Sequence, residues 1–283
     1  MGDLDGRTFL ITGANTGIGK ETARALASRG ARVHIACRSE ESGRKAIQEI
    51  AAQTGSRKLE LLSLDLGDLD SVRACAQEFL ARDEPLHVLI NNAGLAGKHG
   101  KTASGFEAAF GTNHIGPFLL TSLLLDRIRE SAPARVVNVA SVAHYDARGI
   151  DFDAVRKPTR TITGMREYRV SKLANVLHAG ELARRLENTG VTTYSLHPGV
   201  VASDIWRRVP WPARALMKRR MISPEEGART SVYCATAPEL ADQTGLYYDE
   251  CAVRQPGAAA GAELAGELWR RSAEWVSAVG RVG

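Results

Sequence analysis

Short runs of β-branched and apolar residues alternate with longer segments of helical pattern along most of the chain. Strands that are apolar on both faces are typical of a parallel sheet, because helices on both sides of such a sheet keep its faces out of water. The alternation therefore predicts an α/β fold with a doubly wound parallel sheet of the Rossmann type. The predicted strands lie in residues 7–13, 31–38, 58–66, 87–94, 134–141, 191–199 and 245–250.

Size and composition favour one domain. The chain has 283 residues, of which 44% are hydrophobic and 24% are charged, which is enough apolar material for one large core. No repeat, low-complexity segment or linker interrupts the pattern, so we expect residues 1–283 to form a single domain that ends in a helix over about 258–279. In such folds ligands bind beyond the carboxyl ends of the strands, and functional residues are expected there.

The first predicted strand ends in the glycine-rich turn TGANTGIG, residues 12–19, directly before a helical segment. Glycines 13, 17 and 19 allow a tight turn, and the N–H groups at the start of the helix favour an anion. At the first strand–helix junction this turn predicts a site for the pyrophosphate of a nucleotide. The alternative is a tight turn that binds nothing.

Arg38 follows the second predicted strand, where NAD-binding units carry an acid that holds the ribose 2′-hydroxyl. A guanidinium can instead pair with a 2′-phosphate through charge-assisted hydrogen bonds. Glu40 and Glu41 fall in the first turn of the next predicted helix, where acids are favourable for other reasons. The sequence therefore predicts NADP(H) as the cofactor.

Tyr168 and Lys172 lie four residues apart in the predicted helix GMREYRVSKLANVLHAGELARRL. Side chains at this spacing leave one helix face with Cβ atoms roughly 5–6 Å apart. A nearby ammonium favours the phenolate and lowers the tyrosine pKa from about 10, which suits a proton-transfer pair. The alternative is that Tyr168 packs at a helix margin while Lys172 is solvated.

Several classes of function are disfavoured. The net charge is +5, but the basic residues are interleaved with acids, as on a solvated helix surface, so we expect no nucleic-acid partner. The four cysteines form no metal-binding pattern and fit a reduced compartment, and His114, His144 and His197 lack ligand spacing, so we expect no metal and place these histidines in the core or at a rim. The absence of a G-x-S-x-G motif argues against a hydrolase.

The N-terminal residues run from charged positions straight into a predicted strand, which indicates no signal peptide. No stretch of the sequence approaches the roughly 18 apolar residues of a transmembrane helix. We therefore expect a cytoplasmic protein without a transmembrane segment.

Six motifs in order resemble those of the short-chain dehydrogenase/reductase family, from about Arg7 to about Tyr248. They are TGANTGIG, the pair Asp65–Leu66, NNAG at 91–94, TNHIGPFLLT with Asn113, VVNVAS with Ser141 followed by Tyr168 and Lys172, and HPGVVAS at 197–203. Three segments resemble sequences of the retinol-dehydrogenase-like branch of this family: PARVVNVASVAHY, SKLANVLHAGELARRL and GVTTYSLHPGVV.

The resemblance implies a catalytic tetrad of Asn113, Ser141, Tyr168 and Lys172. Tyr168 would be the general acid in reduction and the base in oxidation, with Lys172 lowering its pKa and holding the nicotinamide ribose. Ser141 would bind the carbonyl oxygen, and Asn113, on the preceding helix, would position a water. The cofactor-binding residues implied are Gly13, Asn15, Thr16, Gly17, Ile18, Gly19, Arg38, Asp65, Leu66, Asn92, Ala93, Gly94, Tyr168, Lys172, Pro198, Gly199, Val201 and Ser203, the last standing where the family often has threonine.

Two segments outside this machinery bear on the substrate. The 27 positions from Ser141 to Tyr168 exceed the family's minimum, so we expect an excursion beside the active site over about 142–167. A substrate lid is expected over about 204–222, where arginines and lysines without an acid are interleaved with large apolar residues such as Trp206 and Trp211. That mixture suits a lipophilic aldehyde or ketone, retinal among them, and leaves open a peripheral membrane contact through 205–222.

The predicted function is therefore hydride transfer between NADP(H) and a lipophilic carbonyl or alcohol. Two alternatives stay open: a tailoring ketoreductase that acts on a bulky natural product, and a dinucleotide-binding sensor without catalysis. A homo-oligomer is compatible with the sequence, which does not fix the oligomeric state.

Overall fold

The computed structural model describes residues 2–200 and 222–278. The predicted lid, with Trp206 and Trp211, and the predicted cofactor residues Val201 and Ser203 lie outside the described residues. No helix in the described part of the chain combines the length and the apolar character needed to cross a bilayer.

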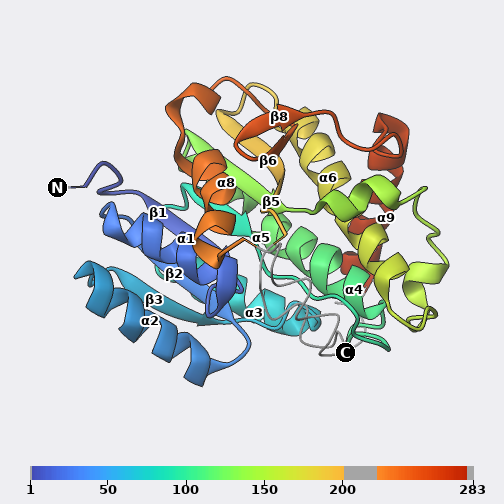
Figure 1. Ribbon diagram of the computed structural model, residues 1–283, viewed down its shortest axis with the longest axis horizontal. Coiled ribbons are helices and arrows are strands. Elements are labelled where there is room, and N and C mark those ends of the chain that lie inside the picture. The colour runs from blue at the N-terminus through green and yellow to red at the C-terminus, as the bar shows by residue number, and fades with distance from the viewer. Residues whose placement is uncertain (1, 201–221, 279–283) are drawn as a thin grey trace.

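One eight-stranded sheet forms the centre of the molecule, in the order β3-β2-β1-β4-β5-β6-β7-β8 (Figure 1). The strands β1 to β7 are parallel, and β8 pairs with β7 in the antiparallel direction. All seven predicted strands are present. The strands are β1 (Thr8–Thr12), β2 (Arg32–Cys37), β3 (Leu59–Ser63), β4 (Val88–Asn91), β5 (Ala134–Val139), β6 (Val191–His197), β7 (Leu246–Asp249) and β8 (Ala252–Arg254).

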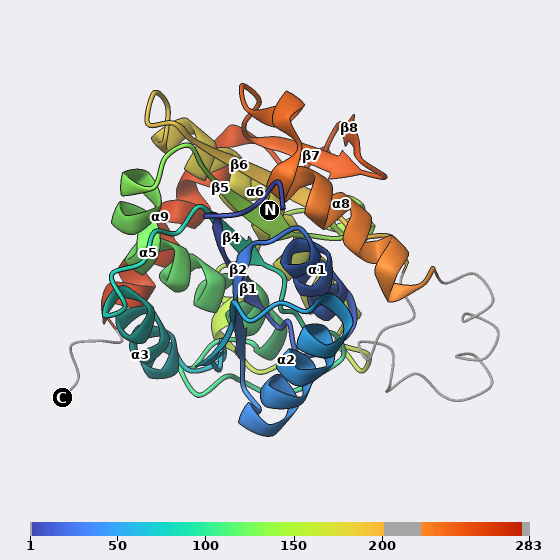
Figure 2. The ribbon, with the colours of Figure 1, turned by 90° about the vertical axis from the view of Figure 1, so that its left-hand side faces the viewer.

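Helices cover both faces of the sheet, as the alternating pattern predicts (Figure 2). One face carries α1 (Gly17–Ser28), α2 (Glu40–Thr54) and α8 (Pro224–Thr236). The other carries α3 (Leu69–Leu80), α5 (Gly116–Glu130), α6 (Met165–Arg185) and α9 (Ala262–Ala278). Shorter turns are α4 (Ala108–Phe110), η1 (Gly111–Ile115), η2 (Val142–Asp146), η3 (Ala154–Arg156) and η5 (Pro238–Leu240).

Local sequence accounts for where several helices begin. Ser39 caps α2 by accepting a hydrogen bond from the Ser42 N–H, and Asp68 caps α3 by accepting from the Asp70 N–H. Ser223 and Glu226 form a reciprocal capping box at the start of α8. Ser39, Asp68 and Ser223 each come directly before their helix and mark the position where the helix begins.

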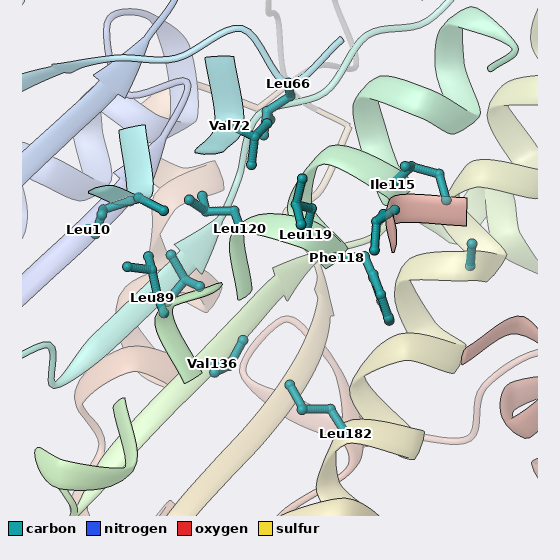
Figure 3. Packing of buried hydrophobic residues seen from close by; sticks show 14 of the residues in the cluster. Leu10, Leu66, Val72, Leu89, Ile115, Phe118, Leu119, Leu120, Val136 and Leu182 are labelled. Atoms are coloured by element: carbon teal, nitrogen blue, oxygen red, sulfur yellow. The ribbon is translucent and has the colours of Figure 1, made fainter. Parts of the chain in front are cut away.

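The core lies in two layers because successive strand residues point to opposite faces. In β1, Phe9 and Ile11 pack under α1 and α8, whereas Leu10 packs under α3 and α5. Figure 3 shows Leu10, Leu89 and Val136 from three neighbouring strands beside Leu119 and Leu120 of α5. Because helices cover both faces of the sheet, the polar residues that follow the strands lie together at its carboxyl edge.

Candidate active site

The turn between β1 and α1 approaches the end of β4 very closely. A Cβ added to Gly13 would lie 2.9 Å from the Ala93 Cα, and one added to Gly19 would lie 2.4 Å from the Asn92 Nδ2. The two segments are bonded together, since Asn92 Nδ2 donates to Thr12 O at 2.8 Å and Thr12 Oγ1 accepts from the Asn92 and Ala93 N–H groups at 3.0 Å. These glycines are required by space as well as by the positive φ of +67° at Gly13.

The start of α1 faces the same edge with unpaired donors. Thr16 occupies the N-cap position without a side-chain capping bond, and Gly17 follows with φ of +54°. The first N–H groups of a helix have no partner within the helix, so an anion placed here would be bound by backbone donors and by the helix dipole. A phosphate therefore fits the residues present.

A cleft of about 450 Å³ runs beyond the ends of β1 to β4. Arg38 stands on its rim with a side chain that is 70% exposed, and its Nη1 lies 3.9 Å from Asp65 Oδ2, too far for a hydrogen bond. The guanidinium is thus open to a bound anion. The predicted cofactor residues that line this cleft are Gly13, Asn15, Thr16, Arg38, Asp65, Leu66, Ala93 and Gly94.

Four other predicted cofactor residues lie at the same strand ends without lining the cleft. Gly17, Ile18, Gly19 and Asn92 do not line it, although Gly19 and Asn92 hold the turn in place through the close contacts above. Glu40 and Glu41 lie in the first turn of α2, as predicted.

Tyr168 and Lys172 emerge from the inner face of α6, where Lys172 Nζ lies 5.7 Å from the centre of the Tyr168 ring. Lys172 is only 2% exposed and Tyr168 only 7%. Nζ donates to Val139 O at 2.9 Å, and Asn175 Nδ2 donates to the same oxygen at 3.1 Å. The alternative of a solvated lysine at a helix margin is therefore wrong.

Burial changes the proton affinity of both groups. It lowers the pKa of Lys172 to about 8, because an ammonium is poorly solvated in the interior. It raises the pKa of Tyr168, which a hydrogen bond with the Ser141 side chain partly offsets. Burial of the phenol therefore dominates the pKa of Tyr168, and the expected lowering by Lys172 stays a prediction.

Asn113 lies in the π-helical turn η1 that leads into α5, and not in a regular helix as expected. Both polar atoms of its amide group are bonded: Oδ1 accepts from Leu95 N–H at 2.9 Å, and Nδ2 donates to Leu95 O at 3.0 Å and to Ser171 Oγ at 2.9 Å. Turns of this kind occur often at functional sites. A Cβ added to Gly94 would lie 3.3 Å from Lys172 Nζ and 3.5 Å from Asn113 Oδ1, so both side chains meet at this glycine.

Ser141 follows β5 and caps the short turn η2. Its Oγ accepts from the Ala143 N–H at 3.2 Å, and its carbonyl oxygen lies 2.6 Å from His144 Nδ1. Because the Ser141 side chain also bonds with Tyr168, the two hydroxyl groups can reach one substrate oxygen together. The structure thus brings Asn113, Lys172, Tyr168 and Ser141 to adjacent strand ends.

The loop after β6 is described only at its two ends. Pro198 and Gly199 follow His197, and Val200 O accepts a hydrogen bond from the Ile222 N–H at 3.0 Å. A Cβ on Gly199, whose φ is +87°, would lie 2.3 Å from Ile222 Cδ1. The two ends of the 201–221 segment are therefore held side by side near the carboxyl end of β6.

The three histidines noted in the sequence are all buried. His114 bonds with Ser272 of α9 at 3.0 Å, and His144 bonds with both Ser141 and Gly257. His197 ends β6, and burial lowers its pKa. None of the three belongs to a group of metal-ligand spacing among the described residues.

Two other features lie apart from the cleft. A larger cavity of about 960 Å³ is lined by part of the 142–167 segment and by Arg169 and Val170 of α6, and its lining contains none of the tetrad. His34, Glu60 and Glu84 have ligand atoms within 4.8 Å of one another. Arg32 pairs with both carboxylates, at 2.8 Å and 3.3 Å, and Arg82 also pairs with Glu60, so we interpret this group as an ion-pair network.

Sequence reasoning missed four supporting residues: Thr12, Ser171, Asn175 and His144. Ser171 Oγ donates to Tyr168 O at 2.7 Å while accepting from Asn113, so it links two members of the tetrad. Helical spacing could have found Ser171 and Asn175, which stand three residues after Tyr168 and Lys172. Thr12 opens the glycine-rich motif and the sequence predicts a core or rim position for His144, but their hydrogen-bond partners are distant in sequence and have no local signal.

Comparisons with known proteins agree with this geometry. Residues 7–151 match the family described as short chain dehydrogenase. Retinol dehydrogenase 12 of Homo sapiens is 50% identical over 254 residues, which cover 88% of this chain and 79% of that protein.

Solved structures with the same fold include an uncharacterized protein from Mycobacterium Paratuberculosis, with a TM-score of 0.76 and 33% identity over 98% of both chains. An actinorhodin polyketide ketoreductase solved with NADPH matches with a TM-score of 0.68 and 26% identity, covering 88% of this chain and 97% of that one.

A doubly wound sheet with a glycine-rich turn and a buried Tyr–Lys pair agrees with the class of nucleotide-dependent oxidoreductases that these comparisons indicate. The chain belongs to the short-chain dehydrogenase/reductase family and to its retinol-dehydrogenase-like branch. It is accordingly an oxidoreductase of a family that uses a nicotinamide cofactor.

Proposed function

We propose that this protein is an NADP(H)-dependent oxidoreductase that transfers hydride between the nicotinamide and the carbonyl carbon of a lipophilic aldehyde or ketone, retinal among them. The observation that carries the proposal is that Asn113, Lys172 and Tyr168 are buried together, next to the partly exposed Ser141. Lys172 and Asn113 both approach Gly94, which lines the cleft. A protein that only bound a dinucleotide would have no need of Ser141, Tyr168 and Lys172 together.

The cofactor, when bound, supplies or accepts the hydride. In reduction, Tyr168 gives its phenolic proton to the carbonyl oxygen, and solvent restores that proton afterwards. Ser141 donates a hydrogen bond to the same oxygen, where negative charge develops. In oxidation, the phenolate of Tyr168 accepts the proton of the alcohol.

Lys172 and Asn113 assist Tyr168 without contacting the reacting carbonyl group. Lys172 lies within reach of Gly94, which lines the cleft, and is placed to hold the ribose of the nicotinamide. Its pKa of about 8 lets it gain or lose a proton near neutral pH. Asn113, fixed by both polar atoms of its amide, holds η1 against the loop after β4 and is placed to order a water beside Lys172.

Arg38 supports NADP(H) over NAD(H). It stands at the end of β2 with its guanidinium exposed and open, and no acid occupies the corresponding position. The NADPH bound in the actinorhodin polyketide ketoreductase structure also supports this choice.

That relative favours a second candidate, a ketoreductase that acts on a bulky natural product. The cytoplasmic location stays a prediction from the sequence, and a membrane contact through 205–222 stays an open alternative.

A substrate series tests the proposal. Oxidation of NADPH and of NADH is followed with aldehydes of increasing chain length, retinal, a polycyclic ketone and a small sugar. We expect NADPH to be preferred and kcat/KM to rise about fourfold per methylene before levelling, since each buried methylene contributes about 0.8 kcal/mol. A flat series, or a sugar as best substrate, contradicts a lipophilic substrate. Activity confined to the polycyclic ketone favours the second candidate, and no turnover with any compound favours a sensor.

A further inference from the structure

His144 forms two directional hydrogen bonds in the interior, next to the proposed catalytic serine. Its side chain is 0% exposed. Nδ1 lies 2.6 Å from Ser141 O, and Nε2 lies 3.0 Å from the Gly257 N–H. A carbonyl oxygen can only accept and a backbone N–H can only donate, so one neutral tautomer, with the proton on Nδ1, satisfies both contacts.

Aromatic neighbours fix the ring in this orientation. The ring centre of His144 lies 4.1 Å from that of Tyr145 and 4.7 Å from that of Tyr247. Tyr145 Oη donates to Gln255 O at 2.8 Å, which attaches the same C-terminal segment a second time. A Cβ added to Gly257 would lie 3.2 Å from the Tyr145 Cα, so the segment 255–257 lies directly on η2.

These contacts tie a segment over 100 positions away to Ser141, which caps η2 two residues after the end of β5. Ser141 has extended backbone, with φ of −169° and ψ of 153°, and its carbonyl group is the first link between β5 and η2. Holding that carbonyl fixes the plane of the Ser141–Val142 peptide, and with it the direction from which the Ser141 side chain leaves the backbone. Ser141 Oγ is otherwise oriented by one longer bond from the Ala143 N–H, at 3.2 Å, and by Tyr168.

We propose that His144 is a positioning residue for carbonyl reduction: by bonding the Ser141 carbonyl on one side and the Gly257 N–H on the other, it holds the Ser141 hydroxyl toward the substrate oxygen. The inference rests on the proposed function, because it assigns a purpose to His144 only if Ser141 binds that oxygen.

Two substitutions test the hydrogen bond to Ser141 O and the hydrogen bond from Gly257 N–H separately. In His144→Asn the side-chain amide can take the place of Nδ1 and still donate to Ser141 O, while nothing reaches Gly257. In His144→Gln the longer side chain can reach Gly257, while Ser141 O loses its donor. Tyr145→Phe is the matched control, because it removes only the bond to Gln255 and so loosens the same segment without touching Ser141.

The measurements are kcat and KM for the carbonyl substrate, Kd for NADPH and the melting temperature. All three variants should lower the melting temperature. His144→Asn and Tyr145→Phe should keep kcat within about threefold of wild type, whereas His144→Gln should lose about tenfold in kcat with unchanged Kd, as expected for one directing hydrogen bond.

Equal kcat values in the two His144 variants, whether both normal or both reduced, would overturn the positioning role and leave a structural one. Tyr168→Phe, assayed alongside, distinguishes a failure of the proposed function from a failure of the proposed role of His144. A wild-type protein without turnover would remove the proposed function and the inference together, while an active wild type with a Tyr168-dependent rate and equal His144 variants would remove the inference alone.

Discussion

At the residue scale, Lys172 is buried by α6 and β5 and its ammonium forms no ion pair among the described residues. Its pKa in the folded protein is about 8, against an ordinary value of 10.5. Between these two values the unfolded chain binds more protons than the folded one, so the penalty for burying the charge is complete below pH 8 and fades as the pH rises. The shift corresponds to roughly 3 kcal/mol as an upper bound.

Lys172→Met should therefore stabilise the cofactor-free protein while abolishing turnover. We expect the free energy of unfolding at pH 7 to rise by on the order of 1–3 kcal/mol, and by less at pH 10. Asn175 still donates to Val139 O, so that oxygen keeps a partner. Urea unfolding at both pH values gives the comparison, with Lys45→Met on the exposed side of α2 as the control. A less stable Lys172→Met protein at pH 7 would contradict the assigned penalty.

Arg38→Ala should remove most of the preference for NADPH by weakening NADPH binding alone. A charge-assisted contact to the 2′-phosphate is worth about 1.5–3 kcal/mol, or roughly ten- to a hundredfold in Kd, and NADH has no group to lose. Arg44→Ala is a suitable control, since Arg44 is also exposed but pairs with Glu40 on α2. Titration of both variants with NADPH and NADH decides the matter, and equal affinity of the wild type for the two cofactors is incompatible with the role of Arg38.

At the element scale, α9 is held against α5 and α6 by an unusual set of rings. The Trp269 ring lies 5.0 Å from Phe118 and 5.8 Å from His178, and His114 bonds with Ser272 at 3.0 Å. His178 Nε2 has no hydrogen-bond partner among residues 2–200 and 222–278, and burial lowers the pKa of this histidine to about 4. The helix is therefore docked by histidines that must stay neutral.

Docking of this kind makes stability fall in acid. As the pH drops from 6.5 toward 4, the unfolded chain protonates at His178 before the folded protein does, so the free energy of unfolding falls across that window and levels below it. The loss is on the order of 3 kcal/mol from His178. His178→Leu should flatten this pH dependence, while His99→Leu in an exposed loop should leave it unchanged. Denaturant unfolding between pH 7 and pH 4 measures the slopes, and parallel curves for wild type and His178→Leu would refute the assignment.

Strands and helices that have a regular pattern of apolar residues and are bounded by turn residues could be predicted from the sequence. β8 and the π-helical turn η1 have no such pattern and could not. Residues 8–12 are buried on both faces and follow the expected strand pattern. β8 has only three residues, two of them exposed, and is set by a turn in which Glu250 and Cys251 take positive φ. The π-helical form of η1 has no pattern in sequence, because the amide of Asn113 and its distant partners Leu95 and Ser171 define it.

At the scale of the whole molecule, the sheet gathers residues that the sequence keeps far apart. Thr12 ends β1, and Arg38, Asp65, Asn92 and Ser141 each come shortly after a different strand. Because parallel strands end at one edge, the proximity of these residues could be predicted once the fold was assigned. The protonation of Lys172 and Tyr168 could not be predicted, because the pKa of each group depends on burial by segments far away in the chain. The contact between His144 and Gly257 is equally beyond local pattern, since it requires β7 and β8 to return the chain to η2.

The central claim is that Tyr168 transfers the proton while the cofactor transfers the hydride, and one comparison tests it most directly. NADPH oxidation with retinal and with a medium-chain aldehyde is measured for wild type and Tyr168→Phe, together with Kd for NADPH. The account predicts a loss of about 10²- to 10⁴-fold in kcat with Kd within about twofold of wild type, because the substitution removes one transferable proton and almost no volume. A Tyr168→Phe protein that binds NADPH normally and keeps more than about a tenth of the wild-type kcat would contradict it.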